Sequence, residues 1–455
     1  TSQIVRINNI KQRHLGGRMF CRWGTVMSKQ KVELLSPAGN LEKLKIAINY
    51  GADAVYGGVS HFSLRIRASK EFTFETFKEG IDYAHARGKK VYATINGFPF
   101  NAQIELLKKH IASMAALKPD GFIVAAPGVV RLCREIAPEI DIHLSTQANV
   151  LNYLDAQVFW DMGVKRIVVA REISLKDVIE IKKHLPDMEI EIFVHGSMCF
   201  AYSGRCLISA VQMGRVPNRG SCANDCRFEY TLYAGNDEHG SLFRLEEEPG
   251  VGTYIFNSKD MNLASHIKEI LDSGAVDSLK IEGRTKSPYY AAVTAKAYRE
   301  AIDDYYENKF DASKYQKELH TTKNRGFTDA YLIHKPFEKL DSQNHDYALS
   351  KGSFEVTGLV SEDEEHFYCK YKVYPNEDIE IFTPHNTVLH ECDNEIGRVF
   401  KKENGLYYIN FKKILTQENK ELESVHSGNV NKIKLPCKLP YLTMFRVENI
   451  GENIE

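Results

Sequence analysis

The sequence lacks a long hydrophobic run, and neither sign of charge is in excess. No stretch of about 18 apolar residues, the length that a membrane-spanning helix requires, occurs in the 455 residues. The first 26 residues also lack the apolar segment of a secretory signal, so we expect a cytoplasmic protein with no membrane partner. Lysine and arginine total 59 against 60 for aspartate and glutamate, which excludes a global basic field. Any contact with RNA must therefore use a local basic patch.

Two catalytic motifs of hydrolases are also missing. The chain has neither the H-E-x-x-H helix of zinc peptidases nor the G-x-S-x-G turn of serine hydrolases. These absences do not exclude a peptidase, because a serine, a histidine and a carboxylate can converge from distant positions. Ser203 and His195 are the pair to consider under that alternative.

Short apolar or β-branched segments alternate with amphipathic stretches from Val32 onward. This order is typical of repeated strand–helix units around a parallel sheet. We predict eight strands, at residues 33–36, 54–57, 91–95, 121–124, 142–145, 166–169, 190–194 and 278–281. Eight such units in succession favour a closed (β/α)8 barrel of the TIM type over an open sheet.

The periodicity divides the chain into several parts. Residues 1–30 form a basic segment without periodicity, which we interpret as an upstream lead outside the fold. The barrel domain spans residues 31–310, with a long insertion at 195–277 after the seventh strand. A polar linker at 311–349 precedes a period-two pattern at 350–440, which predicts a small antiparallel β-barrel. Residues 441–455 remain as a tail.

Six lysines of the predicted C-terminal domain are candidates for binding RNA phosphate. A solvated surface is the commoner explanation for lysines on such strands. They are Lys401, Lys402, Lys412, Lys413, Lys432 and Lys434.

Four of the nine cysteines lie close together in the insertion. Their spacing is C-x6-C-x15-C-x3-C, formed by Cys199, Cys206, Cys222 and Cys226, and the glycines between them favour loops that wrap around one centre. Four thiolates can complete a zinc or an iron–sulfur site. Because structural zinc sites prefer two C-x2-4-C pairs, and one pair here has that spacing, we favour iron–sulfur over zinc. Four unrelated buried thiols are the remaining alternative, as we expect for Cys133 and Cys369.

Polar residues lie near the predicted strands where the mouth of a barrel would be. Active sites of such barrels lie at the carboxyl ends of the strands, so we expect the cysteine insertion and these residues to share that end. They are Glu33, Tyr56, Asn96, Gln147, Arg171, Glu172, His195, Lys280, Glu282 and Arg284.

We expect Tyr56, Gln147, Arg171, Lys280 and Arg284 to bind the substrate, and Glu172, Glu282 and His195 to take part in catalysis. Arg171 and Arg284 can grip a carboxylate or phosphate in two places, and Glu172 or Glu282 can act as a base. His195 immediately precedes the cysteine loop, which makes it a further catalytic candidate. A structural ion pair at the strand end is the alternative for the charged residues, and a hydrogen-bonded loop histidine is the alternative for His195.

The sequence around the cysteines, at residues 191–206 and 218–227, resembles the signature of the collagenase-like peptidase family U32. The similarity extends over about residues 31–440. Further similar segments are 33–39, 51–57, 143–149, 170–172, 279–284 and 324–328.

The resemblance implies an enzyme with an iron–sulfur cofactor. Related members hydroxylate RNA or a quinone precursor, and several hold a [4Fe–4S] cluster, which implies that Cys199, Cys206, Cys222 and Cys226 are its ligands. One barrel followed by a β-domain is most similar to members that hydroxylate a tRNA uridine with the help of a small carboxylate such as prephenate. We therefore predict tRNA uridine hydroxylation, with tRNA as a partner. The alternatives are a collagenase-like endopeptidase and an RNA-binding maturation factor with a structural metal.

Overall fold

The computed structural model describes residues 31–59, 62–64, 72–236, 240–245, 256–334, 342–344, 349–350, 352–428 and 431–449. The predicted lead at residues 1–30 lies outside this described part, as do portions of the predicted insertion, linker and tail. The described residues from Val32 onward belong to one compact unit.

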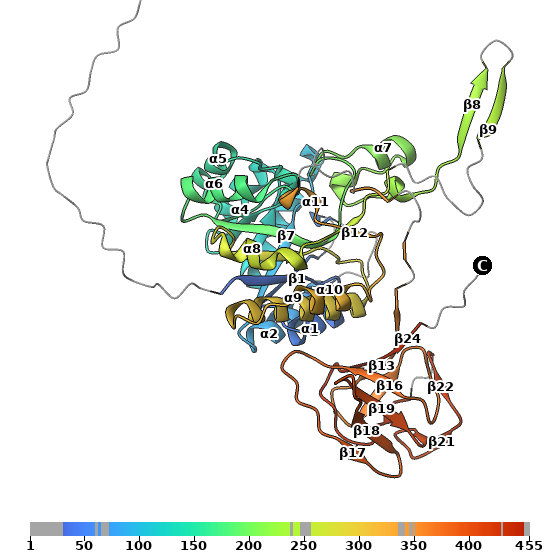
Figure 1. The fold of residues 1–455 in the computed structure, drawn as a ribbon. Coiled ribbons are helices and arrows are strands. Elements are labelled where there is room, and N and C mark those ends of the chain that lie inside the picture. Colours follow the sequence, from blue (N-terminus) through green and yellow to red (C-terminus); the bar gives the residue numbers. More distant parts are fainter. Residues whose placement is uncertain are drawn as a thin grey trace, which may run out of the picture. The chain divides into compact units, whose positions relative to one another are not determined.

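Eight parallel strands close into a barrel (Figure 1). Each strand pairs with the next, and the last pairs with both the seventh and the first, which completes the closure. The predicted (β/α)8 barrel is therefore confirmed. Its strands are β1 (Glu33–Pro37), β2 (Ala54–Gly57), β3 (Lys90–Ile95), β4 (Gly121–Val124), β5 (Asp141–Leu144), β6 (Arg166–Val168), β7 (Glu189–Ser197) and β11 (Ser278–Ile281).

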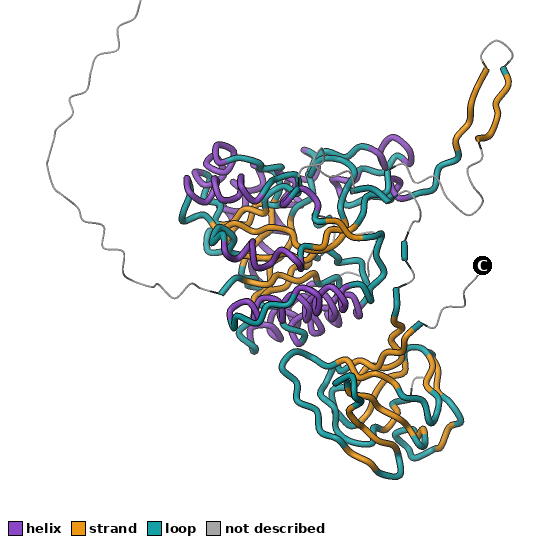
Figure 2. The backbone as a smooth tube through the Cα atoms, viewed as in Figure 1, coloured by secondary structure: helices purple, strands orange, loops and turns teal. Residues whose placement is uncertain are grey.

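Helices surround the strands on the outside, as the purple and orange segments of Figure 2 show. Asn40 and Ser287 cap helices α1 and α9 with their side chains, and Pro288 supplies the fixed φ that suits a first helical position. The helices that follow the strands are α1 (Leu41–Asn49), α2 (Phe74–His85), α3 (Ile104–Ala116), α4 (Pro127–Ile136), α5 (Tyr153–Asp161), α6 (Leu175–His184), α8 (Ile267–Asp272) and α9 (Pro288–Tyr306).

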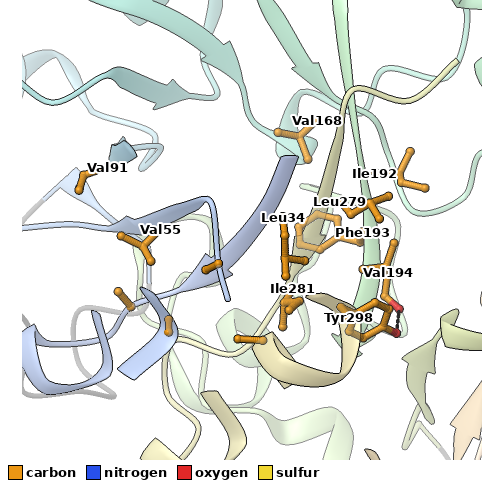
Figure 3. Close-up of a cluster of buried hydrophobic side chains, with 14 of the residues drawn as sticks. Leu34, Val55, Val91, Val168, Ile192, Phe193, Val194, Leu279, Ile281 and Tyr298 are labelled. Atoms are coloured by element: carbon orange, nitrogen blue, oxygen red, sulfur yellow. Dashed lines mark hydrogen bonds between the residues drawn. The ribbon is translucent and has the colours of Figure 1, made fainter. Parts of the chain in front are cut away.

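The strands bury side chains on both faces. Leu34, Val55 and Val91 belong to the core that includes the buried faces of the helices, part of which is drawn in Figure 3. Alternate residues form a second, smaller cluster, made of Leu35, Ala54, Tyr56, Tyr92 and Ile123. Near-continuous apolar strands are expected of a parallel sheet that is buried on both faces.

A charged network lies inside the barrel near the starts of its strands. Arg166 lies 2.5 Å from Glu33 and 3.1 Å from Glu191, and Lys280 donates to Glu191 at 2.7 Å. Burial alone would raise the pKa of Glu191, but Lys280 and Arg166 hold that pKa below its usual value. Our expectation that Glu33 lies at the mouth is wrong, because β1 begins at this residue and so places it at the opposite end.

The long insertion contains several short elements. Strand β7 continues through Ser197 and pairs antiparallel with β10 (Asp260–Asn262), which in turn pairs with β12 (Phe327–Thr328). Between β7 and β10 lie α7 (Ile208–Met213) and a hairpin of β8 (Leu232–Asn236) and β9 (Ser241–Leu245).

The stretch that the sequence suggests as a polar linker is partly folded. It contains α10 (Ala312–Leu319), β12 and α11 (Ala330–Ile333). Tyr315 and Leu319, four residues apart on one face of α10, are buried and add to the barrel core.

The C-terminal part is a curled antiparallel sheet, as the period-two pattern predicts. Strand β24 lies within the predicted tail and pairs with β13 and β16, so the sheet continues past residue 440. The strands are β13 (Phe354–Val360), β14 (His366–Cys369), β16 (Ile379–Phe382), β17 (Cys392–Asp393), β18 (Gly397–Lys401), β19 (Tyr407–Phe411), β23 (Ile433–Lys434) and β24 (Met444–Glu448).

Among the described residues, every helix is too short or too polar to cross a membrane.

Candidate functional site

A cavity of about 150 Å³ lies at the carboxyl ends of the barrel strands, where the loop of the cysteine insertion closes over it. Twelve of the fifteen predicted site residues line it, whereas Glu33, Glu172 and His195 are absent from its lining. The twelve are Tyr56, Asn96, Gln147, Arg171, Cys199, Ser203, Cys206, Cys222, Cys226, Lys280, Glu282 and Arg284.

The four clustered cysteines all face this cavity, while Cys133 is buried in helix α4 and Cys369 in strand β14. Burial raises the pKa of the Cys206 thiol, and the charges of Cys199 and Cys222 raise it further. The pKa of Cys226 is raised by burial and then by the other three thiols, so the four groups are close enough to interact. Four thiols therefore lie together at one cavity.

The donor chemistry of these thiols suits a thiolate-bound group. Soft sulfur ligands select iron–sulfur clusters or zinc over hard cations. No three His, Cys, Asp or Glu side chains of the described residues form a group that could hold one metal ion. The four cysteines therefore line one cavity, but no three of these described side chains are grouped closely enough to hold a single ion.

Arg171 and Glu282 face each other across the cavity. The Arg171 Nη2 atom lies 3.7 Å from the Glu282 Oε2 atom, and its guanidinium stacks over the Phe193 ring at 4.0 Å. The Tyr56 hydroxyl donates to the Ile281 carbonyl at 3.0 Å and also reaches Glu282 at 3.3 Å. This arrangement places a flat cation beside a carboxylate at the pocket, and the guanidinium has the planar geometry that suits an anionic substrate.

The other two cations are more firmly held. Lys280 is buried, donates to Glu191 and lies 4.4 Å over the Tyr56 ring. Arg284 donates to the Ser63 hydroxyl at 2.7 Å and to the Thr94 hydroxyl at 3.2 Å. Both contribute positive charge to the cavity, and both also have the structural contacts that the alternative interpretation expected.

Gln147 presents an unused hydrogen-bond donor. Its Oε1 atom accepts from the Ser145 hydroxyl at 3.3 Å, whereas its Nε2 atom is buried without a partner among the described residues. Because an unsatisfied buried amide costs free energy, this donor is suited to a carbonyl oxygen of a bound molecule.

Glu172 lies behind the cavity and orients the cysteine loop. Its Oε1 atom accepts from the Ser203 backbone N–H at 2.8 Å and from the Ser203 hydroxyl at 3.2 Å. Its Oε2 atom is buried without a hydrogen-bond partner among the described residues. The contact fixes the segment between Cys199 and Cys206.

His195 is placed away from the cavity. It is 1% exposed, and the rings of Tyr290, Tyr298 and Phe327 surround it. Figure 3 shows Tyr298 beside Val194, whose carbonyl accepts from the tyrosine hydroxyl at 2.7 Å. Burial lowers the pKa of His195 to about 3, so the imidazole stays neutral at physiological pH.

The structure also shows lining residues that sequence reasoning missed. Phe193, Thr146, Asn218 and Arg227 line the same cavity. Arg227 directly follows Cys226, so its place at the cavity could have been predicted from its position in the cysteine loop. The place of Phe193 could not, because it lies in an apolar strand where burial in the core is the ordinary outcome.

Known proteins share most of this chain. A protein from Helicobacter pylori called tRNA hydroxylation protein P is 64% identical over 418 residues, which cover 92% of this chain and 99% of that protein. The Escherichia coli protein of that name is 40% identical, covering 81% of this chain and 90% of its own length. A 23S rRNA 5-hydroxycytidine synthase of Escherichia coli is 34% identical, covering 63% of this chain and 42% of its own length. Residues 39–342 match Peptidase family U32, and the chain belongs to that family.

Proposed function

We propose that this chain takes part in the hydroxylation of a tRNA uridine. The observation that carries the proposal is the cavity itself, where four thiols and the cations Arg171, Lys280 and Arg284 meet at the carboxyl end of a parallel barrel. The names of the relatives, which refer to hydroxylation of tRNA and of ribosomal RNA, support the same reaction class. A cytoplasmic location stays a prediction.

The proposal includes a [4Fe–4S] cluster held by Cys199, Cys206, Cys222 and Cys226, with zinc as the alternative. When bound, such a cluster would supply one-electron chemistry next to the substrate. Four sulfur ligands leave no open position for a catalytic water on a zinc ion, so this ligand set suits redox chemistry better than hydrolysis.

The cations of the pocket suit a small carboxylate such as prephenate as a second partner. Arg171 is the best placed, because its guanidinium is flat against Phe193 and forms only a loose ion pair of 3.7 Å with Glu282, which an anionic ligand can replace. Lys280 of β11 and Arg284, which follows that strand, add positive charge. Glu282 is the carboxylate of the lining and therefore the proposed base.

The pocket also has a group suited to a uracil ring. The free Nε2 donor of Gln147 would bind a uracil carbonyl oxygen, which satisfies a buried group that has no described partner.

The peptidase alternative needs Ser203 and His195 as a nucleophile and base. In the structure the Ser203 hydroxyl donates to Glu172, and His195 lies in a buried aromatic cage. The pair is therefore not hydrogen-bonded within the described residues, which favours hydroxylation over proteolysis.

The function is tested in a strain that lacks the gene. We expect a transfer RNA nucleoside in that strain to lose the mass of one oxygen atom, measured by mass spectrometry of digested tRNA. The peptidase alternative would be favoured over hydroxylation by two results together. The nucleosides would be unchanged, and the purified protein would cleave denatured collagen and lose that activity on Ser203→Ala or His195→Ala. RNA that is bound but never modified would instead support the maturation factor.

A further inference from the structure

The cysteine loop at residues 199–228, a part of the insertion, carries a local excess of positive charge that the composition of the chain does not show. Residues 199–228 contain four arginines and one acid, Asp225, against a net charge of -1 for the whole chain. Asp225 is 1% exposed, so the accessible surface of this loop is positive. None of the four arginines pairs with an acidic side chain in the described part of the chain. Uncompensated guanidinium groups of this kind bind phosphate.

Three of the six candidate lysines of the C-terminal sheet pair with carboxylates. Lys402 lies 2.9 Å from Asp378, Lys412 lies 2.5 Å from Asp393, and Lys432 lies 2.7 Å from Asp363. An RNA phosphate would have to displace a carboxylate at each of these three positions. The arginines of the insertion have no such competitor among the described residues.

Exposed aromatic side chains flank the cysteine loop: Tyr202 lies three residues before Arg205, Phe228 directly follows Arg227, and Phe100 contacts Arg219. Tyr202 and Phe100 are each 61% exposed, and Phe228 is 47% exposed. Exposed aromatic rings interleaved with arginines are the means by which proteins bind unpaired nucleotides, because every base has a face that can stack.

One part of this surface is already fixed. The Arg219 guanidinium lies over the Phe100 ring at 4.1 Å and donates to the Gln103 side chain at 2.8 Å. A backbone hydrogen bond of 3.2 Å from Phe98 N–H to the Asn218 carbonyl joins the two loops. The Arg219 guanidinium is therefore already ordered on the Phe100 ring before RNA binds, which lowers the entropic cost of binding.

A second hollow of about 250 Å³ lies against the first cavity. Arg215, Arg227 and Lys286 line it, and it shares Cys222 and Asn224 with the cavity that holds the proposed site. Glu282 lines both hollows as well, so a base in the first cavity would have three cations and one carboxylate beside its backbone.

From these observations we propose that the rim surface, defined as Phe100, Tyr202, Arg205, Arg215, Arg219 and Phe228, binds the unpaired nucleotides that flank the target base. The inference rests on the proposed function for RNA as the substrate and adds where and how it is held. Bases stack on the aromatic rings, and the arginines and the second hollow hold the phosphates. Substrates are therefore loops of RNA, not duplexes.

The test measures binding of a synthetic RNA hairpin with an unpaired, uridine-containing loop, by fluorescence anisotropy with the full chain. Tyr202→Ala should weaken binding about tenfold without changing its salt dependence, and Tyr202→Phe should keep it. Arg215→Ala should weaken binding and reduce the slope of log K against log salt by about 0.7. Arg131→Ala, an exposed arginine of helix α4 paired with Glu135 at 3.1 Å, is the matched control and should change neither.

Two outcomes overturn the proposal. One is unchanged hairpin affinity in both Tyr202→Ala and Arg215→Ala. The other is a variant of the rim surface whose oligomeric mass, measured by light scattering, differs from that of the wild type while its RNA affinity does not. That result would indicate a protein interface that includes the exposed Leu207, Val211 and Met213. If the hairpin binds through the rim surface but deletion of the gene leaves tRNA nucleosides unchanged, the proposed function is wrong and the rim surface stands. If deletion removes the hydroxyl but the rim variants bind the hairpin normally, the rim surface is wrong and the proposed function stands.

Discussion

At the scale of the residue, neighbours far away in the sequence decide what a side chain can do. His195 precedes the cysteine loop, which made it a reasonable catalytic candidate. Its surroundings come from Tyr298 on α9 and Phe327 on β12, each more than a hundred residues further along the chain. The sequence could place His195 at the end of a strand but could not show that it is covered.

The neutral state of His195 makes stability depend on pH. Its pKa of about 3 in the folded chain lies below the roughly 6.5 of an unfolded histidine, so acid protonates the unfolded chain first. Stability is therefore complete above about pH 6.5 and falls as the pH drops towards 3. Between pH 7 and pH 5, the wild type should lose about 2 kcal/mol relative to His195→Gln, measured by urea unfolding. A wild type minus variant difference that stays constant over this range would contradict the assignment.

At the scale of the element, periodicity predicts the barrel and fails where strands are very short. Predicted strands 54–57, 121–124 and 278–281 coincide with β2, β4 and β11. Strand β7 was predicted to end at residue 194, yet it continues to Ser197 because β10 pairs with it. A strand of three residues such as β10 is too short to show an alternating pattern, so the sequence did not predict it.

The cysteine loop depends on Gly204 for its path. Gly204 has φ +75°, and a Cβ atom there would lie 2.2 Å from the Gln147 carbonyl oxygen. Gly204→Ala must therefore move the loop from Gln147, and we expect a lower unfolding temperature together with loss of tRNA hydroxylation. Gly214→Ala is the matched control, since its φ is +64° but nothing lies within 4 Å, and it should cost only about 1–2 kcal/mol. Equal effects of the two substitutions on hydroxylation would show that the close approach does not matter.

At the scale of the whole molecule, the sequence predicted which residues lie at the same end of the barrel, but not which side chains form ion pairs and hydrogen bonds. Residues from seven of the barrel strands or their carboxyl ends and from the insertion meet in one cavity, as the barrel topology predicts. Their partners were not predictable: Arg446 contacts Glu380, Glu318 and the Tyr289 hydroxyl, which lie 66, 128 and 157 residues away. Composition likewise gave a neutral chain and hid the positive loop at residues 199–228.

The central claim is that the thiol-lined cavity performs a hydroxylation of tRNA. It is tested most directly by returning cysteine variants to the strain that lacks the gene and measuring the hydroxylated nucleoside in its tRNA. Cys222→Ala removes one sulfur from the cavity, whereas Cys437→Ala removes a thiol of the C-terminal sheet outside the cavity lining. We predict that the wild type and Cys437→Ala restore the hydroxyl and that Cys222→Ala does not. Full restoration by Cys222→Ala would contradict the account.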